Sequence, residues 1–190
     1  MTPIVAITGG IGAGKTHVCR LLSTYGIEVY DCDATAKRLM REDVSIRHAL
    51  LSLVGSEAYV GKTLQKAVIA KFLLSSEANK QAVNSIVHPA VARDFLSSRL
   101  RFIECAILFE SHFDELIHPD YVVCVTAPLQ VRIKRIMQRD GISSLRAEEW
   151  TDRQMEQDEM VARSNYVINN DGVADVRAQV EDLLRITNSL

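Results

Sequence analysis

A glycine-rich segment near the N-terminus contains the residues whose types and spacing point most directly to chemistry. Residues 9–16 read Gly-Gly-Ile-Gly-Ala-Gly-Lys-Thr and match the phosphate-loop pattern G-x-x-x-x-G-K-[ST] at every fixed position. Glycines allow the backbone to curl so that successive N–H groups face phosphate oxygens, and the helix that follows adds its positive N-terminal end. We therefore predict that a nucleotide binds at Gly10, Ile11, Gly12, Ala13, Gly14, Lys15, Thr16 and His17.

Two side chains at the end of this segment have more specific expected roles. Lys15 is expected to reach the β- and γ-phosphates of the nucleotide, and we assign it a catalytic role. The hydroxyl of Thr16 is the predicted ligand for Mg²⁺. A glycine-rich turn without function would account for the glycines, but it would not account for the adjacent lysine and threonine.

The elements expected on either side of the segment suit this function. Residues 4–8 are apolar and rich in strand-forming side chains, which predicts a buried strand of a parallel sheet. Residues 16–24 have apolar side chains at helical spacing, Gly26 closes that helix, and residues 27–30 predict a second short strand. Strand, glycine loop, helix and strand together form a βαβ unit.

The remainder of the chain begins with a long helical stretch, residues 33–100, and then alternates between strands and helices. Further strands are expected at 102–109, 121–126 and 166–168. Helices are expected at 62–74, 78–96, 128–139, 144–163 and from 176 onward, with a start or a kink at His88-Pro89. This order predicts an α/β fold of three layers with a five-stranded, mostly parallel sheet.

The expected chemistry is that of a small kinase, because phosphoryl transfer depends on positioning and charge neutralisation by a short set of parts. A guanine-reading N-K-x-D motif is missing, since Asn79-Lys80 is followed by Gln81-Ala82. We predict one P-loop kinase domain, 1–190, with ATP as the phosphoryl donor. Its expected parts are a core (1–32, 101–131, 164–190), a helical insertion (33–100) and a further helical segment (132–163).

Carboxylates follow two of the expected strands. Asp31 and Asp33 come directly after the second strand, and in open α/β sheets ligands bind beyond the carboxyl ends of strands. Alternation along an extended end would point both in the same direction. We predict that both bind the acceptor and that Asp33 deprotonates its hydroxyl, although an aspartate here also suits the N-cap of a helix starting near Ala34. Glu110 ends the third strand and is expected to hold substrate or contact Mg²⁺ through water, or is an ordinary strand-terminal charge.

Cationic side chains gather after the fourth strand. Arg132, Arg135 and Arg139 are spaced i, i+3 and i+7, which predicts that they share one helix face. Arginine suits planar, bidentate contact with phosphate, so we expect Arg139 in catalysis, Arg135 in nucleotide binding and Arg132 in substrate binding. A solvated basic face is the alternative. His88 either contacts a substrate phosphate or hydroxyl or only marks a kink at Pro89.

Composition narrows the class of protein further. The chain has 190 residues, 47% hydrophobic and 24% charged residues and a formal net charge of −2, which exclude a disordered chain and do not suggest a nucleic-acid partner. No apolar run approaches the roughly 18 residues that span a bilayer, and no signal peptide is recognisable. The four cysteines form no CxxC pair, which suits a reducing compartment. We expect a cytoplasmic protein without a membrane partner, as a monomer or weak homo-oligomer.

Taken in order, the motifs resemble the dephospho-coenzyme A kinase family over nearly the whole chain. The resemblance rests on the phosphate loop preceded by Thr8, and on six further segments. These segments are Val29-Tyr30-Asp31-Cys32-Asp33, Ile86-Val87-His88-Pro89, Leu108-Phe109-Glu110, Arg135-x-x-x-Arg139-Asp140, Arg153-Gln154 and Tyr166-Val167-Ile168-Asn169-Asn170. Three positions depart from the common pattern: Cys32 replaces Ala, Ala106 replaces a frequent Pro, and Asn165 replaces a frequent Asp.

The resemblance implies phosphorylation of the ribose 3′-hydroxyl of dephospho-CoA by ATP with Mg²⁺, the last step of coenzyme A synthesis. It implies that Asp33 is the base, that the helical insertion 33–100 binds the acceptor, that the helical segment 132–163 forms a lid, and that Asn170 lies near the adenine of ATP. A nucleoside monophosphate kinase is the alternative enzyme, but a phosphate acceptor has less need of a base such as Asp33. A nucleotide-binding regulator without turnover is a third alternative, and it would not need Asp33 or the lid arginines.

Overall fold

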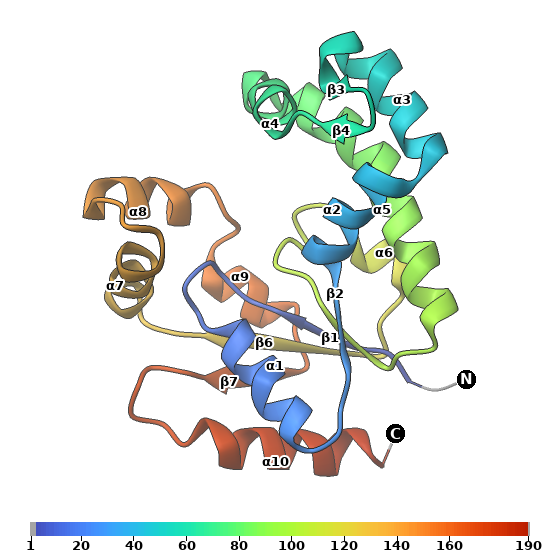
Figure 1. The fold of residues 1–190 in the computed structure, drawn as a ribbon. Helices are drawn as coiled ribbons and strands as arrows, with labels where there is room; N and C mark the ends of the chain where they lie inside the picture. The colour runs from blue at the N-terminus through green and yellow to red at the C-terminus, as the bar shows by residue number, and fades with distance from the viewer. Residues whose placement is uncertain (1–2, 190) are drawn as a thin grey trace. The chain divides into compact units, whose positions relative to one another are not determined.

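The computed structural model describes residues 3–189, which form two compact units (Figure 1). Of the described residues, 3–30 and 100–189 form the core unit and 31–99 form the helical unit.

The core unit is built on a five-stranded sheet with the order β2-β5-β1-β6-β7. β1 pairs in parallel with both β5 and β6, and β6 pairs in parallel with β7. Non-consecutive neighbours therefore require crossover connections, as expected for an α/β fold. The strands are β1 (Val5–Thr8), β2 (Val29–Asp31), β5 (Phe102–Glu104), β6 (Tyr121–Thr126) and β7 (Tyr166–Asn169).

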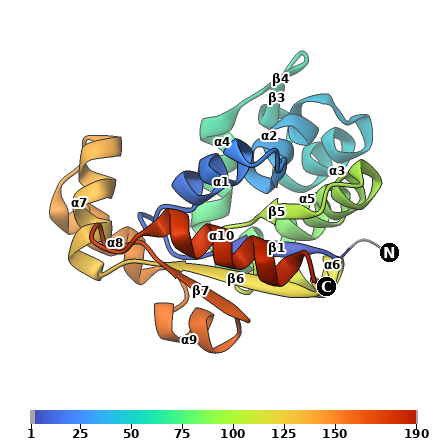
Figure 2. The same cartoon turned by 90° about the horizontal axis from the view of Figure 1, so that it is seen from below.

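Helices cover both faces of this sheet. α1 (Lys15–Thr24) and α10 (Val176–Thr187) lie on one face, and α9 (Gln157–Ala162) lies on the other (Figures 1 and 2). This confirms the predicted α/β class and the mostly parallel five-stranded sheet. Among residues 3–189, no helix combines the length and the apolar character needed to cross a bilayer.

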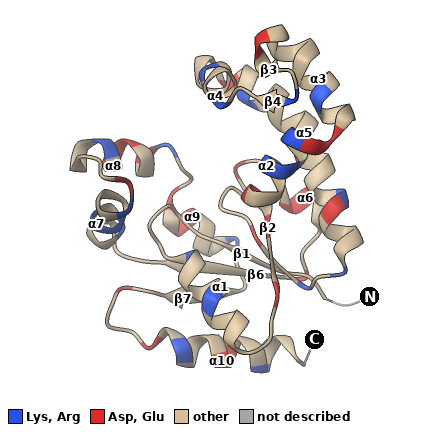
Figure 3. Cartoon of the chain, in the orientation of Figure 1, with Lys and Arg blue, Asp and Glu red and all other residues tan. Residues whose placement is uncertain are grey.

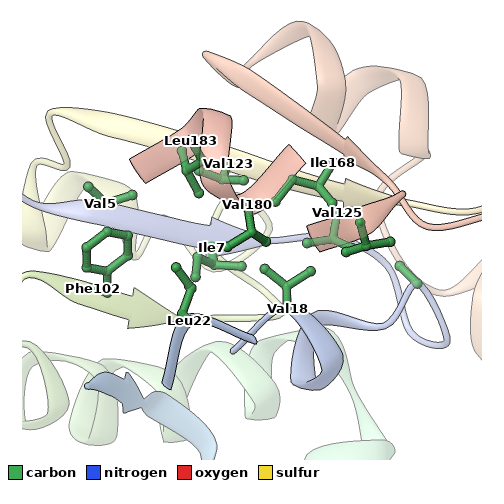
Figure 4. Close-up of a cluster of buried hydrophobic side chains, with 12 residues drawn as sticks. Val5, Ile7, Val18, Leu22, Phe102, Val123, Val125, Ile168, Val180 and Leu183 are labelled. Carbon is green, nitrogen blue, oxygen red and sulfur yellow. The ribbon is translucent and has the colours of Figure 1, made fainter. Parts of the chain in front are cut away.

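The main core of this unit lies between the sheet and helices α1 and α10. Val18 and Leu22 of α1 point toward the sheet, as do Val180 and Leu183 of α10 (Figure 4). All four are inaccessible to solvent, as is Ile7 of β1 against which they gather. Burial of this apolar surface fixes α1 on the sheet and therefore fixes the loop that joins β1 to α1.

A smaller apolar cluster joins α7 (Leu129–Asp140) to α8 (Ser144–Asp152). Ile133 and Ile136 of α7 pack against Ala147 of α8. Ile11 of the phosphate loop and Trp150 pack against the same cluster. The loop is therefore in contact with hydrophobic groups of the two helices as well as with the sheet.

Two predicted elements of the core unit are shorter than expected. The strand predicted at 102–109 ends at Glu104, because residues beyond Cys105 form turns, such as the one closed by Phe113 N–H and the Leu108 carbonyl. Glu104, rather than Glu110, therefore lies at the end of the strand. The helix predicted at 144–163 is interrupted between α8 and α9, where side-chain to backbone bonds replace the helical pattern. A short helix, α6 (Asp114–Ile117), was not predicted.

The helical unit contains one small hairpin that the sequence interpretation missed. Tyr59 pairs with Leu64 and Val60 with Thr63 across a two-residue turn. The helix predicted to begin at residue 62 therefore begins at Lys66, since the β-branched pair favours a ladder there. The elements are α2 (Cys32–Glu42), α3 (Val44–Val54), η1 (Ser56–Ala58), β3 (Tyr59–Val60), β4 (Thr63–Leu64), α4 (Lys66–Ser75) and α5 (Glu77–Ser98).

α5 continues through Pro89, so of the two predicted alternatives a new helix start at His88-Pro89 is wrong, while a kink there stays a prediction. Proline removes one helical hydrogen bond. The buried face formed by Val83, Val87 and Phe95 lies on both sides of the proline and holds the helix together in spite of that loss.

The core packing makes a direct stability prediction. Leu22→Ala removes a side chain that is 0% exposed and should lower the free energy of unfolding by about 2–5 kcal/mol. Leu145→Ala, at a position 69% exposed in α8, should change it by less than about 0.5 kcal/mol. Urea unfolding of both variants measures the difference, and equal losses would contradict the assigned core.

Candidate functional site

The phosphate loop connects the carboxyl end of β1 to the start of α1. Gly14 precedes the helix in a left-handed conformation, and no side chain caps the helix. The N–H groups at the start of a helix generally lack partners within it, although here the His17 N–H donates to the Gly14 carbonyl at 2.9 Å. This N-terminus therefore presents donors of the kind that bind phosphate. Thr16 and His17 are exposed in this turn. The geometry therefore fits a polyphosphate, as predicted from the sequence.

Lys15 is buried and its ammonium group contacts the loop itself. Lys15 Nζ donates to the carbonyls of Gly9, at 2.8 Å, and Gly10, at 3.4 Å. Glu104 Oε1 lies 3.9 Å from the same Nζ. Burial lowers the pKa of Lys15, and the Glu104 carboxylate opposes that shift. Glu104 was not among the predicted site residues, although an acid within the apolar run 102–109 was a signal that could have identified it.

Arg132 of α7 also contacts the loop. Its Nε donates to the Ile11 carbonyl at 3.0 Å, and its side chain is almost completely buried. Burial lowers the pKa of Arg132, while Glu156 acts in the opposite direction. The backbone of α7 also approaches closely: a Cβ added to Gly12 would lie 2.6 Å from the Arg132 carbonyl oxygen, and Gly12 has φ +78°.

Arg135 and Asn170 bind the next part of the loop together. Arg135 Nη1 donates to the carbonyls of Gly12, at 3.3 Å, and Ala13, at 3.2 Å. Asn170 Nδ2 also donates to the Ala13 carbonyl, at 2.8 Å, and Asn170 Oδ1 accepts from Arg135 Nη2 at 3.4 Å. The structure therefore brings both predicted nucleotide-binding side chains to the loop.

Arg139 does not accompany the other two arginines. Its guanidinium forms a bidentate ion pair with the neighbouring Asp140, with Nη2 to Oδ2 at 2.7 Å. The hydrogen bond to Asp140 raises the pKa of Arg139, and the same bond lowers the pKa of Asp140. Of the three arginines spaced i, i+3 and i+7, Arg132 and Arg135 therefore contact the phosphate loop, and Arg139 is paired with an acid at the surface. Figure 3 shows the Lys and Arg positions of α7 in blue.

Glu110 lies in the turns after β5 rather than at a strand end. Its Oε1 accepts from the Met155 N–H at 3.2 Å, which ties it to the connector between α8 and α9. Its Oε2 is buried and has no hydrogen-bond partner within residues 3–189. The prediction that Glu110 ends the third strand was wrong, since that strand ends six residues earlier, at Glu104.

The remaining predicted residues belong to the helical unit. Asp31 caps α2 by accepting from Ala34 N–H at 2.9 Å, and the helix begins at Cys32. Asp33 therefore lies in the first helical turn, where it pairs with Lys37, and strand alternation does not apply to it. The expectation that both aspartates point the same way along an extended end was wrong. His88 is half-buried within α5.

The protein offers few side chains that could bind Mg²⁺ at this site. Within the described part of the chain, no three His, Cys, Asp or Glu side chains form a group that could hold a metal ion. Mg²⁺ in nucleotide sites commonly uses few protein ligands together with substrate phosphates and water. The exposed hydroxyl of Thr16 at the end of the loop fits this mode of binding.

The parallel sheet, the phosphate loop at the end of β1 and the arginines from α7 define a P-loop small-molecule kinase fold. A shikimate kinase from Acinetobacter baumannii shares this fold with a TM-score of 0.59 at 15% identity, covering 100% of this chain and 94% of that one. The family model for dephospho-CoA kinase matches residues 3–175. The chain belongs to the dephospho-CoA kinase family.

Individual relatives agree with this assignment. Dephospho-CoA kinase from Bacteroides fragilis is 36% identical over 187 residues, covering 95% of this chain and 90% of that protein. The enzyme from Porphyromonas gingivalis is 43% identical over 146 residues, covering 74% of this chain and 71% of that protein. A solved dephospho-CoA kinase from Campylobacter jejuni has a TM-score of 0.69 at 20% identity and covers 100% of this chain and 99% of that one.

The close approach of α7 to Gly12 can be tested against a matched glycine. Gly26 also has φ +78°, but an added Cβ there meets nothing within 4 Å. Gly26→Ala should cost about 1–2 kcal/mol of unfolding free energy from backbone strain alone, with ATP affinity unchanged. Gly12→Ala adds a steric conflict with Arg132 and should also weaken ATP binding, as measured by calorimetry. Equal ATP affinity in the two variants would show that the approach of α7 does not shape the loop.

Proposed function

We propose that the chain transfers the γ-phosphoryl group of ATP to the ribose 3′-hydroxyl of dephospho-CoA, giving coenzyme A and ADP. Membership of the dephospho-CoA kinase family supports the substrate pair. The observation that carries the proposal within the structure is the phosphate loop at the uncapped start of α1, surrounded by Lys15, Arg132 and Arg135. Such a loop is suited to hold the polyphosphate of a nucleotide.

The side chains of the core unit would bind and neutralise the phosphoryl donor. From its position beside the Gly9 and Gly10 carbonyls, to which it donates, Lys15 would also reach the β- and γ-phosphates. Arg135 supports the loop through its bonds to loop carbonyls. Asn170 contacts Arg135 and Ala13 at the same part of the loop, and we propose that it borders the adenine there. Mg²⁺ held by Thr16 would neutralise developing charge on the phosphates.

The acceptor hydroxyl requires a base, and Asp33 is the proposed one. Asp33 would take the proton of the 3′-hydroxyl as that oxygen forms its bond to the γ-phosphorus, while the bond from phosphorus to the bridging oxygen of ADP breaks. Its exposed carboxylate, paired with Lys37, is accessible for this role. We further propose that Asp31, His88, Glu110 and Arg132 contribute to acceptor binding.

Arg139 is proposed to act on the transferring group. It lies at the end of α7, where its present partner is Asp140. To reach a phosphoryl group it would leave that ion pair, and an exposed pair of this kind holds its partners only weakly. We propose that residues 132–163 act as a lid that excludes water during transfer, and that the protein works in the cytoplasm as a monomer or weak homo-oligomer.

An acceptor panel tests the proposed reaction. The purified protein, ATP and Mg²⁺ should release ADP with dephospho-CoA, and the product should carry the new phosphate on the ribose 3′-oxygen by NMR. Nucleoside monophosphates should give no ADP above the rate without an acceptor. ADP release with monophosphates alone would identify a nucleoside monophosphate kinase, and ATP binding without turnover on any acceptor would identify a regulator.

The role of Asp33 has its own test. Asp33→Asn should lower turnover by roughly 10²-fold or more, because the base is lost, while the affinity for ATP is largely kept. Asp43→Asn is a matched control, since Asp43 caps α3 through Ile46 N–H and asparagine caps a helix equally well. Turnover should be unchanged in the control. Near-normal turnover in Asp33→Asn would reject Asp33 as the base.

A further inference from the structure

Ile11 of the phosphate loop contacts the segment that follows β6 through its backbone N–H, its carbonyl and its side chain. Its N–H donates to Gln154 Oε1 at 2.6 Å, and its carbonyl accepts from Arg132 Nε at 3.0 Å. Its side chain packs against the apolar cluster of α7 and α8. All of these groups belong to the core unit. The backbone and the side chain of this one residue are thus both held from the same direction.

Gln154 belongs to the connector between α8 and α9, and residues beside it fasten this connector to the core unit. The next residue, Met155, donates its N–H to Glu110 Oε1 at 3.2 Å. At the far end of the connector, Gln157 Oε1 accepts from the Ala127 N–H, directly after β6, at 3.1 Å. The side-chain amide of Gln154 therefore extends from a segment that is fastened to residues that follow β5 and β6, the two strands paired with β1.

The position of Ile11 in the loop makes this bond consequential. Gly10 and Gly12 flank it, and glycine leaves the backbone a wide choice of conformations. Ile11 is the one large side chain in residues 9–14. Loss of the acceptor would leave the partly buried Ile11 N–H unpaired, and the flexible residues on either side would allow the loop to move toward another partner.

We infer that Gln154 is a positioning residue for nucleotide binding, which accepts the Ile11 N–H and so holds the phosphate loop in the conformation that binds ATP. The Ile11 N–H is engaged by Gln154 at 2.6 Å, so Gln154 acts through the loop rather than on the reacting atoms. The inference rests on the proposed function only for the identity of the nucleotide, and it is independent of the acceptor.

Three variants test the inference. Gln154→Met keeps the length of the side chain and removes the acceptor, whereas Gln154→Glu keeps an acceptor oxygen. Gln138→Met is the matched control, because Gln138 is exposed on α7. The readouts are hydrogen exchange of the Ile11 amide without nucleotide, followed by NMR, and the dissociation constant for ATP, measured by calorimetry without an acceptor.

Gln154→Met should speed exchange of the Ile11 amide and raise the dissociation constant for ATP by about 3- to 10-fold, the effect of one lost hydrogen bond. In turnover assays it should raise the KM for ATP and leave the KM for dephospho-CoA unchanged. Gln154→Glu should restore slow exchange, and Gln138→Met should match the wild type in both readouts.

Two results would overturn the inference. Unchanged exchange in Gln154→Met would show that the bond does not restrain Ile11, and faster exchange with unchanged ATP affinity would show that the restraint does not serve binding. Neither readout depends on dephospho-CoA, so a wrong acceptor would leave both results interpretable. A wild-type protein that binds no ATP would instead reject the proposed function together with this inference.

Discussion

A loop that turns its N–H groups toward phosphate must turn carbonyl groups the other way, because the peptide unit is planar and trans. Buried carbonyls need donors. In this protein cationic side chains supply them over consecutive residues: Lys15 serves Gly9 and Gly10, Arg132 serves Ile11, and Arg135 serves Gly12 and Ala13. The rest of the site depends on this requirement.

The requirement explains why α7 and the loop belong together. Arg132 and Arg135 are one helical turn apart, so both reach successive carbonyls from a single helix. The helix is in turn held by the apolar cluster it shares with α8 and Ile11. Two buried cations near the loop are costly, as the lowered pKa values of Lys15 and Arg132 indicate. Their positive charge lies beside the loop where phosphates would bind, so the free energy spent on burying these cations would be offset by their attraction to the phosphates.

The sequence was sufficient for the parts that have strong local patterns. The phosphate loop, the βαβ unit, the strand at 121–126 and the final helix were all predicted from residue type and spacing, and the fold class was confirmed. The family resemblance was confirmed as well. The roles of individual site residues and the division into core, insertion and lid stay predictions, since no comparison or contact tests them.

The failures arose where long-range contacts decide the local structure. Glu104 lies at the end of β5 because the apolar residues after it form turns that bury Leu108 and Phe113. The sequence pattern of such a buried apolar run does not differ from that of a buried strand. The role of Gln154 could not be predicted from local sequence, because its bond to Ile11 joins residues that are 143 positions apart. Arg139 shares the helical spacing of Arg132 and Arg135, but its side chain forms an ion pair with the adjacent Asp140 at the surface.

The dissociation constant for ATP in three arginine variants tests most directly whether donors to the loop carbonyls determine nucleotide binding. Arg132→Met and Arg135→Met remove donors from loop carbonyls and should each weaken binding by about 10-fold or more, the effect of a lost charged hydrogen bond. Arg139→Met removes the same charge without touching the loop and should weaken binding by less than about 3-fold. Equal losses in all three variants would contradict the account, because they would show that general positive charge, rather than support of the loop carbonyls, determines the affinity for ATP.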